Sequence, residues 1–282
     1  MRRLNPIGVI QGRLLPKYQG RYQAHPVGYW QEEFPMAAEM GLDCIEFILD
    51  FNNAEHNPLL RDAGPDEILL LSEKTGVKVS TVCADYFMEA PLHHPDEQIA
   101  AQSQIVLRRL LSNGKKLRLT DIIVPCVDQS GVNNAAIERL IVRIRPLLEA
   151  AEASGINICL ETDLPPQPFA ELLERFDSPR VTINYDTGNS AALGYDPVEE
   201  VACYGKKIAY IHIKDRKLGG GPVPLGTGDF HFGRFIEALS RENYTGPFIM
   251  QAYRDDEGLA IFKQQLAWVC EQFVEWIGRA GV

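Results

Sequence analysis

Short, apolar, β-rich runs alternate along this chain with longer stretches in which hydrophobic and polar residues recur at helical spacing. This alternation is typical of βαβ units, in which a helix follows each strand and crosses back over the sheet. Because such crossovers join strands that run in the same direction, the pattern predicts a parallel sheet. The eight expected strands cover residues 7–10, 44–48, 77–82, 122–124, 156–160, 181–185, 208–213 and 247–250.

At three places a predicted helix, or the segment after it, ends at a glycine. An apolar strand begins almost at once after each of these glycines. Gly41, Gly76 and Gly155 occupy these positions, and glycine relieves the left-handed strain of a helix C-terminus. Such junctions mark the N-terminal end of barrel strands, whereas polar residues and longer loops follow the opposite ends, where a barrel enzyme has its site. The clearest predicted helices run from about Trp30 to Met40, Asp96 to Leu111 and Asn134 to Ser154.

The fold that these elements predict is a single-domain (β/α)8 TIM barrel that covers residues 1–282. A doubly wound open sheet is the alternative, and it would normally place a glycine-rich turn after its first strand. Here the first strand leads into Gln11-Gly12-Arg13-Leu14, which is no dinucleotide-binding fingerprint. The length of 282 residues and the hydrophobic content of 45% are sufficient to bury one large core.

The chain carries 28 Lys and Arg against 38 Asp and Glu, so its formal net charge is −10. This charge disfavours nucleic acid and anionic lipid as partners, because their phosphate groups would meet net repulsion. No apolar run approaches the roughly 18 to 20 residues of a membrane span, and the first residues lack a secretory signal. We therefore expect a cytoplasmic protein, whose six scattered cysteines are buried free thiols.

Four consecutive strands in the second half of the chain end in residues that can bind a metal: Glu161, Asp186, His212 and Gln251. If the barrel closes, the C-terminal ends of neighbouring strands converge on its axis, so these four side chains can surround one ion. Such a mostly oxygen set suits Mn²⁺, Mg²⁺ or Co²⁺, and Zn²⁺ if a solvent position stays open. Any one of the four residues could equally cap the next helix, but the coincidence of four favours a metal site.

Further polar residues lie just beyond strands that lead to the same mouth. Arg13, Arg216 and Arg254 could bind the phosphate or carboxylate of an anionic substrate, because a planar guanidinium group can donate two parallel hydrogen bonds to such a group. Gln11 is placed to bind a sugar hydroxyl, and Glu46 could point into the barrel mouth. The alternatives are surface arginines that pair with the excess of acids, and a structural, salt-bridged Glu46.

Several segments occur in a fixed order: Leu160-Glu161-Thr162, Asn184-Tyr185-Asp186-Thr187-Gly188-Asn189, His212-Ile213-Lys214-Asp215 and Pro224-Leu225-Gly226-Thr227-Gly228-Asp229. Together they resemble the xylose-isomerase-like barrels, which include sugar phosphate isomerases, sugar and sugar-phosphate 3-epimerases and inosose dehydratases. The resemblance implies an enzyme of carbohydrate metabolism that binds one divalent metal through Glu161, Asp186, His212 and Gln251. It also implies a small sugar or sugar phosphate as substrate, and Glu161 as the base that forms an enediolate.

Gln251 departs from the family's epimerases, which carry carboxylates after both the fifth and the eighth strands. An amide can bind a metal through its oxygen, but it cannot accept and return a proton. Glu161 could therefore act alone as the base of an isomerisation, or Glu46, Asp85 or Asp163 could supply a second proton transfer. The reaction could also be a dehydration, catalysed by a hydro-lyase of the inosose dehydratase type.

A non-catalytic sugar-binding barrel is a further alternative, in which the amide is the relic of a lost base. The family's metal-dependent apurinic endonucleases are disfavoured, because six scattered histidines and a net charge of −10 suit neither a three-metal cluster nor DNA. The sequence does not name the sugar, the native metal or the oligomeric state. Barrels of this family often associate, so a homo-oligomer is one expectation.

Overall fold

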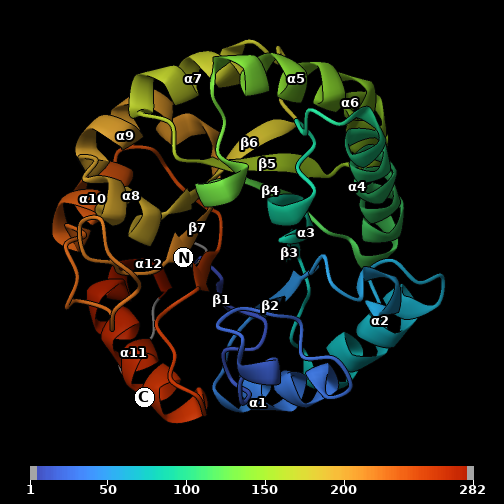
Figure 1. Cartoon of the computed structure of the whole chain (residues 1–282). Helices are drawn as coiled ribbons and strands as arrows, with labels where there is room; N and C mark the ends of the chain where they lie inside the picture. Colours follow the sequence, from blue (N-terminus) through green and yellow to red (C-terminus); the bar gives the residue numbers. More distant parts are fainter. Residues whose placement is uncertain (1–4, 278–282) are drawn as a thin grey trace. The chain divides into compact units, whose positions relative to one another are not determined.

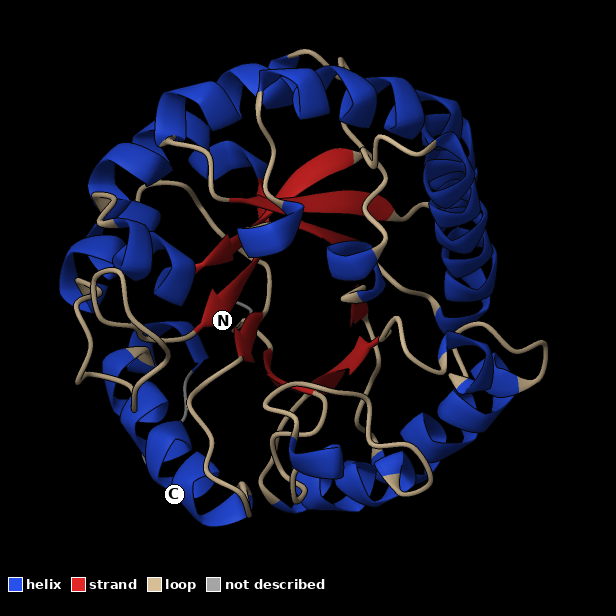
Figure 2. Cartoon of the chain, viewed as in Figure 1, coloured by secondary structure: helices blue, strands red, loops and turns tan. Residues whose placement is uncertain are grey.

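The computed structural model describes residues 5–277, and its eight strands form a closed barrel in the order β1-β2-β3-β4-β5-β6-β7-β8 (Figures 1 and 2). The described pairings are parallel, which confirms the predicted (β/α)8 barrel. The domain range of 1–282 stays a prediction, since residues 1–4 and 278–282 lie outside the described part. The strands are β1 Ile7–Ile10, β2 Cys44–Ile48, β3 Thr81–Cys83, β4 Asp121–Cys126, β5 Asn157–Thr162, β6 Val181–Asp186, β7 Ile208–Ile213 and β8 Phe248–Met250.

The contacts of the chain divide it into two compact units. The first contains the described residues up to Ile45 and those from Asn184 onward, and the second contains Glu46–Ile183. The α-helices of the first unit are α1 Glu33–Glu39, α8 Thr187–Leu193, α9 Pro197–Tyr204, α10 Phe232–Leu239, α11 Leu259–Gln272 and α12 Val274–Ile277. Those of the second unit are α2 Gly64–Thr75, α3 Tyr86–Glu89, α4 Glu97–Leu117, α5 Asn134–Ile144, α6 Leu148–Ser154 and α7 Pro166–Glu174. Within the second unit, α4 packs against both α2 and α6 (Figure 1).

The ends of several predicted elements shift in the structure, and two of the differences are informative. β3 begins at Thr81 rather than at Val77, and the apolar residues Val77 and Val79 are buried in the connection that leads to the strand. The long helix predicted from Asn134 to Ser154 is divided into α5 and α6 by a short 3₁₀ turn that contains Pro146. Proline has no amide hydrogen and its ring clashes with the preceding turn, which accounts for the break.

Two helices end at the glycines that the sequence indicates. Gly76 closes α2 at a φ of 78°, and Gly155 closes α6 at a φ of 74°. A side chain would be strained in this left-handed conformation, so glycine lets the chain turn directly into the next strand. All six cysteines are free, and five of them are buried as predicted, whereas Cys203 is half-buried. None of the described helices is long and apolar enough to cross a membrane.

Candidate active site

Three buried side chains at the C-terminal ends of consecutive strands form a group that could hold a metal ion. They are Glu161 of β5, Asp186 of β6 and His212 of β7, and each offers one ligand atom. These atoms all lie within 4.8 Å of one another. The structure therefore brings together three of the four residues that the sequence singles out as metal ligands.

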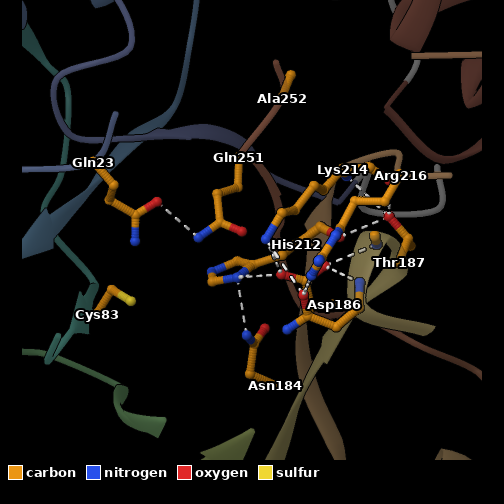
Figure 3. Close-up of polar contacts among 12 residues, drawn as sticks. Gln23, Cys83, Asn184, Asp186, Thr187, His212, Lys214, Arg216, Gln251 and Ala252 are labelled. Carbon is orange, nitrogen blue, oxygen red and sulfur yellow. Dashed lines mark hydrogen bonds and ion pairs between the residues drawn. The ribbon is translucent and has the colours of Figure 1, made fainter. Parts of the chain in front are cut away.

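The two carboxylate oxygens of Asp186 have different partners. Oδ1 accepts hydrogen bonds from the amides of Gly188 at 2.8 Å and Asn189 at 2.9 Å, and so caps the N-terminus of α8. Oδ2 lies 3.2 Å from Nζ of Lys214 and 3.8 Å from Nδ1 of His212 (Figure 3). Burial alone would raise the pKa of Asp186, but the Lys214 ammonium, His212 and the backbone amide outweigh burial and hold the pKa well below its usual value. Asp186 is thus anionic, with Oδ2 directed at the metal-ligand group.

His212 is completely buried, and its Nδ1 lies 3.0 Å from Nδ2 of Asn184 (Figure 3). A neutral imidazole carries a proton on one ring nitrogen and a free lone pair on the other, and a metal binds the nitrogen with the lone pair. Asn184 and Asp186 lie two residues apart on β6, as His212 and Lys214 do at the end of β7. Since side chains two apart on a strand share a face, the sequence could have indicated both Asn184 and Lys214.

Gln251 follows β8 and is held by another glutamine. Its Nε2 donates to Oε1 of Gln23 at 3.0 Å (Figure 3), while its own Oε1 is buried and has no hydrogen-bond partner. A buried carbonyl oxygen without a partner costs about 1–3 kcal/mol. A cation or a substrate hydroxyl at this position would recover that energy, so the oxygen of Gln251 marks a place for a ligand.

Two of the predicted substrate-binding arginines are buried and donate hydrogen bonds to backbone carbonyl groups. Arg13 is 1% exposed and donates to the carbonyl oxygens of Ala252 at 3.0 Å and Tyr22 at 3.1 Å. Arg254 is 3% exposed and donates to the carbonyl oxygens of Gly12 at 2.6 Å and Leu15 at 2.8 Å. These contacts connect the segment after β8 to the loop after β1.

A further carboxylate, which the sequence pattern did not single out, also contacts the loop after β1. Glu33 is fully buried, and it accepts hydrogen bonds from the amides of Gly12 at 2.7 Å and Leu14 at 3.0 Å. Burial raises the pKa of Glu33 to about 7, although both amides and the charges of Arg13 and Arg254 oppose the shift. Gln11, at the start of the same loop, lies close to a histidine, with Oε1 2.8 Å from Nδ1 of His25.

Arg216, the third predicted arginine, lies in a cationic group with Lys214. Nη1 of Arg216 lies 3.0 Å from Oδ1 of Asn189, and Nζ of Lys214 lies 3.4 Å from the same oxygen. Both side chains are partly exposed. Two cations therefore meet beside Asp186, whose single charge lies 3.2 Å from one of them.

Glu46 is completely buried within the unit that also contains Glu161, and it accepts a hydrogen bond from Oγ1 of Thr81 at 3.0 Å. A thiol lies near both carboxylates. Burial raises the pKa of Cys83 well above its usual value, and the negative charges of Asp85, Glu46 and Glu161 raise it further. Cys83 Sγ also donates to Asp85 Oδ1 at 3.2 Å. The negative charges of three carboxylates therefore act on one thiol.

A comparison with known families identifies the family of this chain. A family model described as xylose isomerase-like TIM barrel matches residues 34–272. The chain belongs to this family. The matched range includes the four candidate metal ligands Glu161, Asp186, His212 and Gln251, whereas the loop after β1 precedes it.

Individual relatives are distant but cover most of the chain. L-ribulose-5-phosphate 3-epimerase UlaE of Escherichia coli O1:K1 is 24% identical over 247 residues, which are 83% of this chain and 86% of that protein. The solved structure of 3-keto-D-glucoside 4-epimerase YcjR from E. coli has a TM-score of 0.73 and 18% identity, and the match covers 95% of this chain and 99% of YcjR. The IOLI protein, solved with a bound zinc atom, has a TM-score of 0.76 and 14% identity over 97% of this chain and 100% of IOLI. The two structural matches show that the fold is shared.

Proposed function

We propose that this protein is a divalent-metal-dependent isomerase or epimerase of a small sugar or sugar phosphate. The observation that carries this proposal is the buried group of Glu161, Asp186 and His212, with ligand atoms within 4.8 Å of one another. Membership of the xylose isomerase-like family supports it, and so does the similarity to UlaE and YcjR, both of which are named as sugar epimerases.

The side chains present fit a divalent cation. Two carboxylates and one imidazole supply three donors, and the partnerless Oε1 of Gln251 is a suitable fourth. This set suits Mn²⁺, Mg²⁺ or Co²⁺ and also accepts Zn²⁺, the metal bound to IOLI. When bound, the cation would polarise the substrate carbonyl and make the adjacent C–H bond more acidic.

Glu161 is the base in this proposal. Its carboxylate takes the proton from the carbon beside the carbonyl, the C–H bond breaks, and the electron pair moves toward the carbonyl oxygen to give an enediolate. Glu161, whose proton can exchange with solvent, then protonates the neighbouring carbon. The adjacent hydroxyl becomes the new carbonyl and its proton passes to the former carbonyl oxygen, which completes an isomerisation. Epimerisation needs proton delivery from the opposite face, which the amide of Gln251 cannot supply. Glu46 and Asp85, both buried or half-buried in the unit of Glu161, are our candidates for that second group.

The contacts of the predicted substrate-binding residues suggest different roles for them. Arg13 and Arg254 donate to backbone carbonyls, which supports a role in shaping the loop after β1. Arg216 also donates to a backbone carbonyl, that of Gly220, but it lies beside Lys214 and is partly exposed, which supports a role in binding an anionic group such as a phosphate. We retain Gln11 as a ligand for a substrate hydroxyl.

A hydro-lyase is the second candidate, and the amide at Gln251 favours it. Dehydration of a hydroxyketone requires one base, here Glu161, and a hydroxyl group that leaves with its bonding electrons and takes a proton, which the protonated Glu161 can return, to form water. No second carboxylate on the opposite face is needed. Loss of water from the substrate would distinguish this reaction from isomerisation.

The test is metal-dependent exchange of substrate C–H for deuterium in D₂O, followed by NMR with a panel of ketoses, ketose phosphates and inososes. Native protein is expected to exchange one substrate proton only with Mn²⁺ or a similar ion present, and Glu161→Gln is expected to abolish the exchange. Glu174→Gln, an exposed change of the same type in the same unit, is the control. Metal and sugar binding without exchange for any compound would support a non-catalytic sugar-binding barrel.

A further inference from the structure

A short run of hydrogen bonds connects the backbone to the amide of Gln251. Arg13 is fixed first, because Nε donates to the carbonyl oxygen of Ala252 and Nη1 donates to that of Tyr22. The guanidinium also lies over the Tyr22 ring, 5.0 Å from its centroid. Nη2 of Arg13 then donates to Oε1 of Gln23 at 3.1 Å, and the same oxygen accepts Nε2 of Gln251 at 3.0 Å. All these residues belong to one compact unit.

The direction of every hydrogen bond in this run is determined by Arg13. A guanidinium group can only donate, so the atom of Gln23 that faces it must be the oxygen. That oxygen also faces Gln251, so the nearest atom of Gln251 must be the donor nitrogen. The carbonyl oxygen of Gln251 therefore points away from Gln23, into the buried position where it has no partner.

We propose that Arg13 and Gln23 are positioning residues that turn the Gln251 amide so that its oxygen faces the cation. This inference rests on the proposed function. Arg13 then contributes to the site through Gln23 rather than by binding a substrate anion. The run also explains why an amide suits position 251, because a carboxylate there would place a second oxygen against Oε1 of Gln23. If Gln23 rotated its amide to meet that carboxylate, its nitrogen would face Nη2 of Arg13.

The experiment measures Mn²⁺ binding to the metal-free full-length chain by titration calorimetry, with the visible spectrum of bound Co²⁺ as a second readout of the ligand set. Gln23→Leu removes the acceptor and is expected to weaken Mn²⁺ binding by about 10- to 100-fold, the usual effect of losing an outer-shell partner. Gln251→Leu is expected to weaken binding at least as much. The double variant should bind like Gln251→Leu alone, since both changes break the same run.

Two further variants separate positioning from general damage. Gln23→Glu keeps an oxygen between Arg13 and Gln251, so it should retain affinity and the native Co²⁺ spectrum. Gln264→Leu, an exposed change on α11, should bind like the native chain. Thermal unfolding of each metal-free variant identifies any that fails to fold.

The outcomes distinguish this inference from the proposed function. Mn²⁺ binding to Gln23→Leu that equals native binding, or losses that simply add in the double variant, would overturn the positioning role and leave the metal-dependent function in place. A native chain that binds neither Mn²⁺ nor Co²⁺ would overturn both.

Discussion

Glu33 accepts a hydrogen bond from the amide of Gly12 at 2.7 Å, although 21 residues separate them in the sequence. The same carboxylate, at the start of α1, also accepts the Leu14 amide. One buried side chain therefore fixes the turn that follows β1. Because Arg13 lies between these two amides, the conformation of this turn also determines where the guanidinium of Arg13 points.

The titration of Glu33 should make stability depend on pH. Burial raises its pKa to about 7 in the folded chain, above its value of 4.5 when unfolded. A raised carboxyl pKa contributes stability that is fully present below the unfolded pKa and is lost as pH rises through the folded pKa. We expect the free energy of unfolding of the native chain to fall by up to about 3 kcal/mol from pH 4.5 to 8 relative to Glu33→Gln. Urea unfolding at a series of pH values measures this difference, and parallel curves for the two proteins would contradict it.

Gly12 is required by its backbone conformation. Its φ is +84°, and a Cβ there would lie 3.0 Å from the carbonyl oxygen of Ala24. We expect Gly12→Ala to lower the free energy of unfolding by about 1–2 kcal/mol, because L residues are strained in the left-handed region. Gly233→Ala is the matched control, since this glycine lies in α10 and a Cβ there meets nothing within 4 Å. That variant should gain up to about 1 kcal/mol from helix propensity. Equal effects of the two substitutions in denaturant titrations would refute this interpretation.

Asp186 combines helix capping with the proposed metal ligation, and two substitutions separate these tasks. Asp186→Asn keeps an oxygen that can accept the amides of Gly188 and Asn189, whereas Asp186→Ala removes it. Without metal, we expect the alanine variant to be about 1 kcal/mol less stable than the asparagine variant, the usual value of an N-cap. Both should lose the rise in melting temperature that Mn²⁺ produces in the native chain. An asparagine variant that Mn²⁺ still stabilises fully would exclude this carboxylate as a ligand.

Much of the fold and part of the site follow from local pattern. The eight strands could be predicted because buried β-branched runs and glycine-ended helices leave a signal within a few residues. Glu161, Asp186 and His212 could be grouped because closure of a barrel brings the ends of neighbouring strands together, whatever the loops do. The site residues at strand ends are thus accessible from the sequence once the barrel is assumed.

Contacts between distant segments leave no such signal. Gln23 and Gln251 are 228 residues apart in the sequence. The residues around each of them show no pattern that would predict a contact with the other. Arg13, Arg254 and Arg216 all follow strands and all donate to backbone carbonyls, but only Arg216 stays partly exposed, and the loop geometry alone decides this difference. Glu33 could not be recognised either, because its partners are backbone amides, which every residue except proline offers.

The group of Lys214 and Arg216 leads to a prediction about the substrate. Both cations lie near Oδ1 of Asn189, and one carboxylate, Asp186, lies within salt-bridge distance of Lys214. If Asp186 binds a cation, its charge is shared with that ion, so the two basic groups remain to bind an anion. We expect Arg216→Met to raise the KM for a ketose phosphate by about tenfold or more, the value of one charge-assisted hydrogen bond. The KM for the corresponding unphosphorylated sugar should change little. Arg234→Met, an exposed arginine that pairs with Asp196, serves as the control. Equal losses with both substrates would assign Arg216 to the sugar or to the loop rather than to the phosphate.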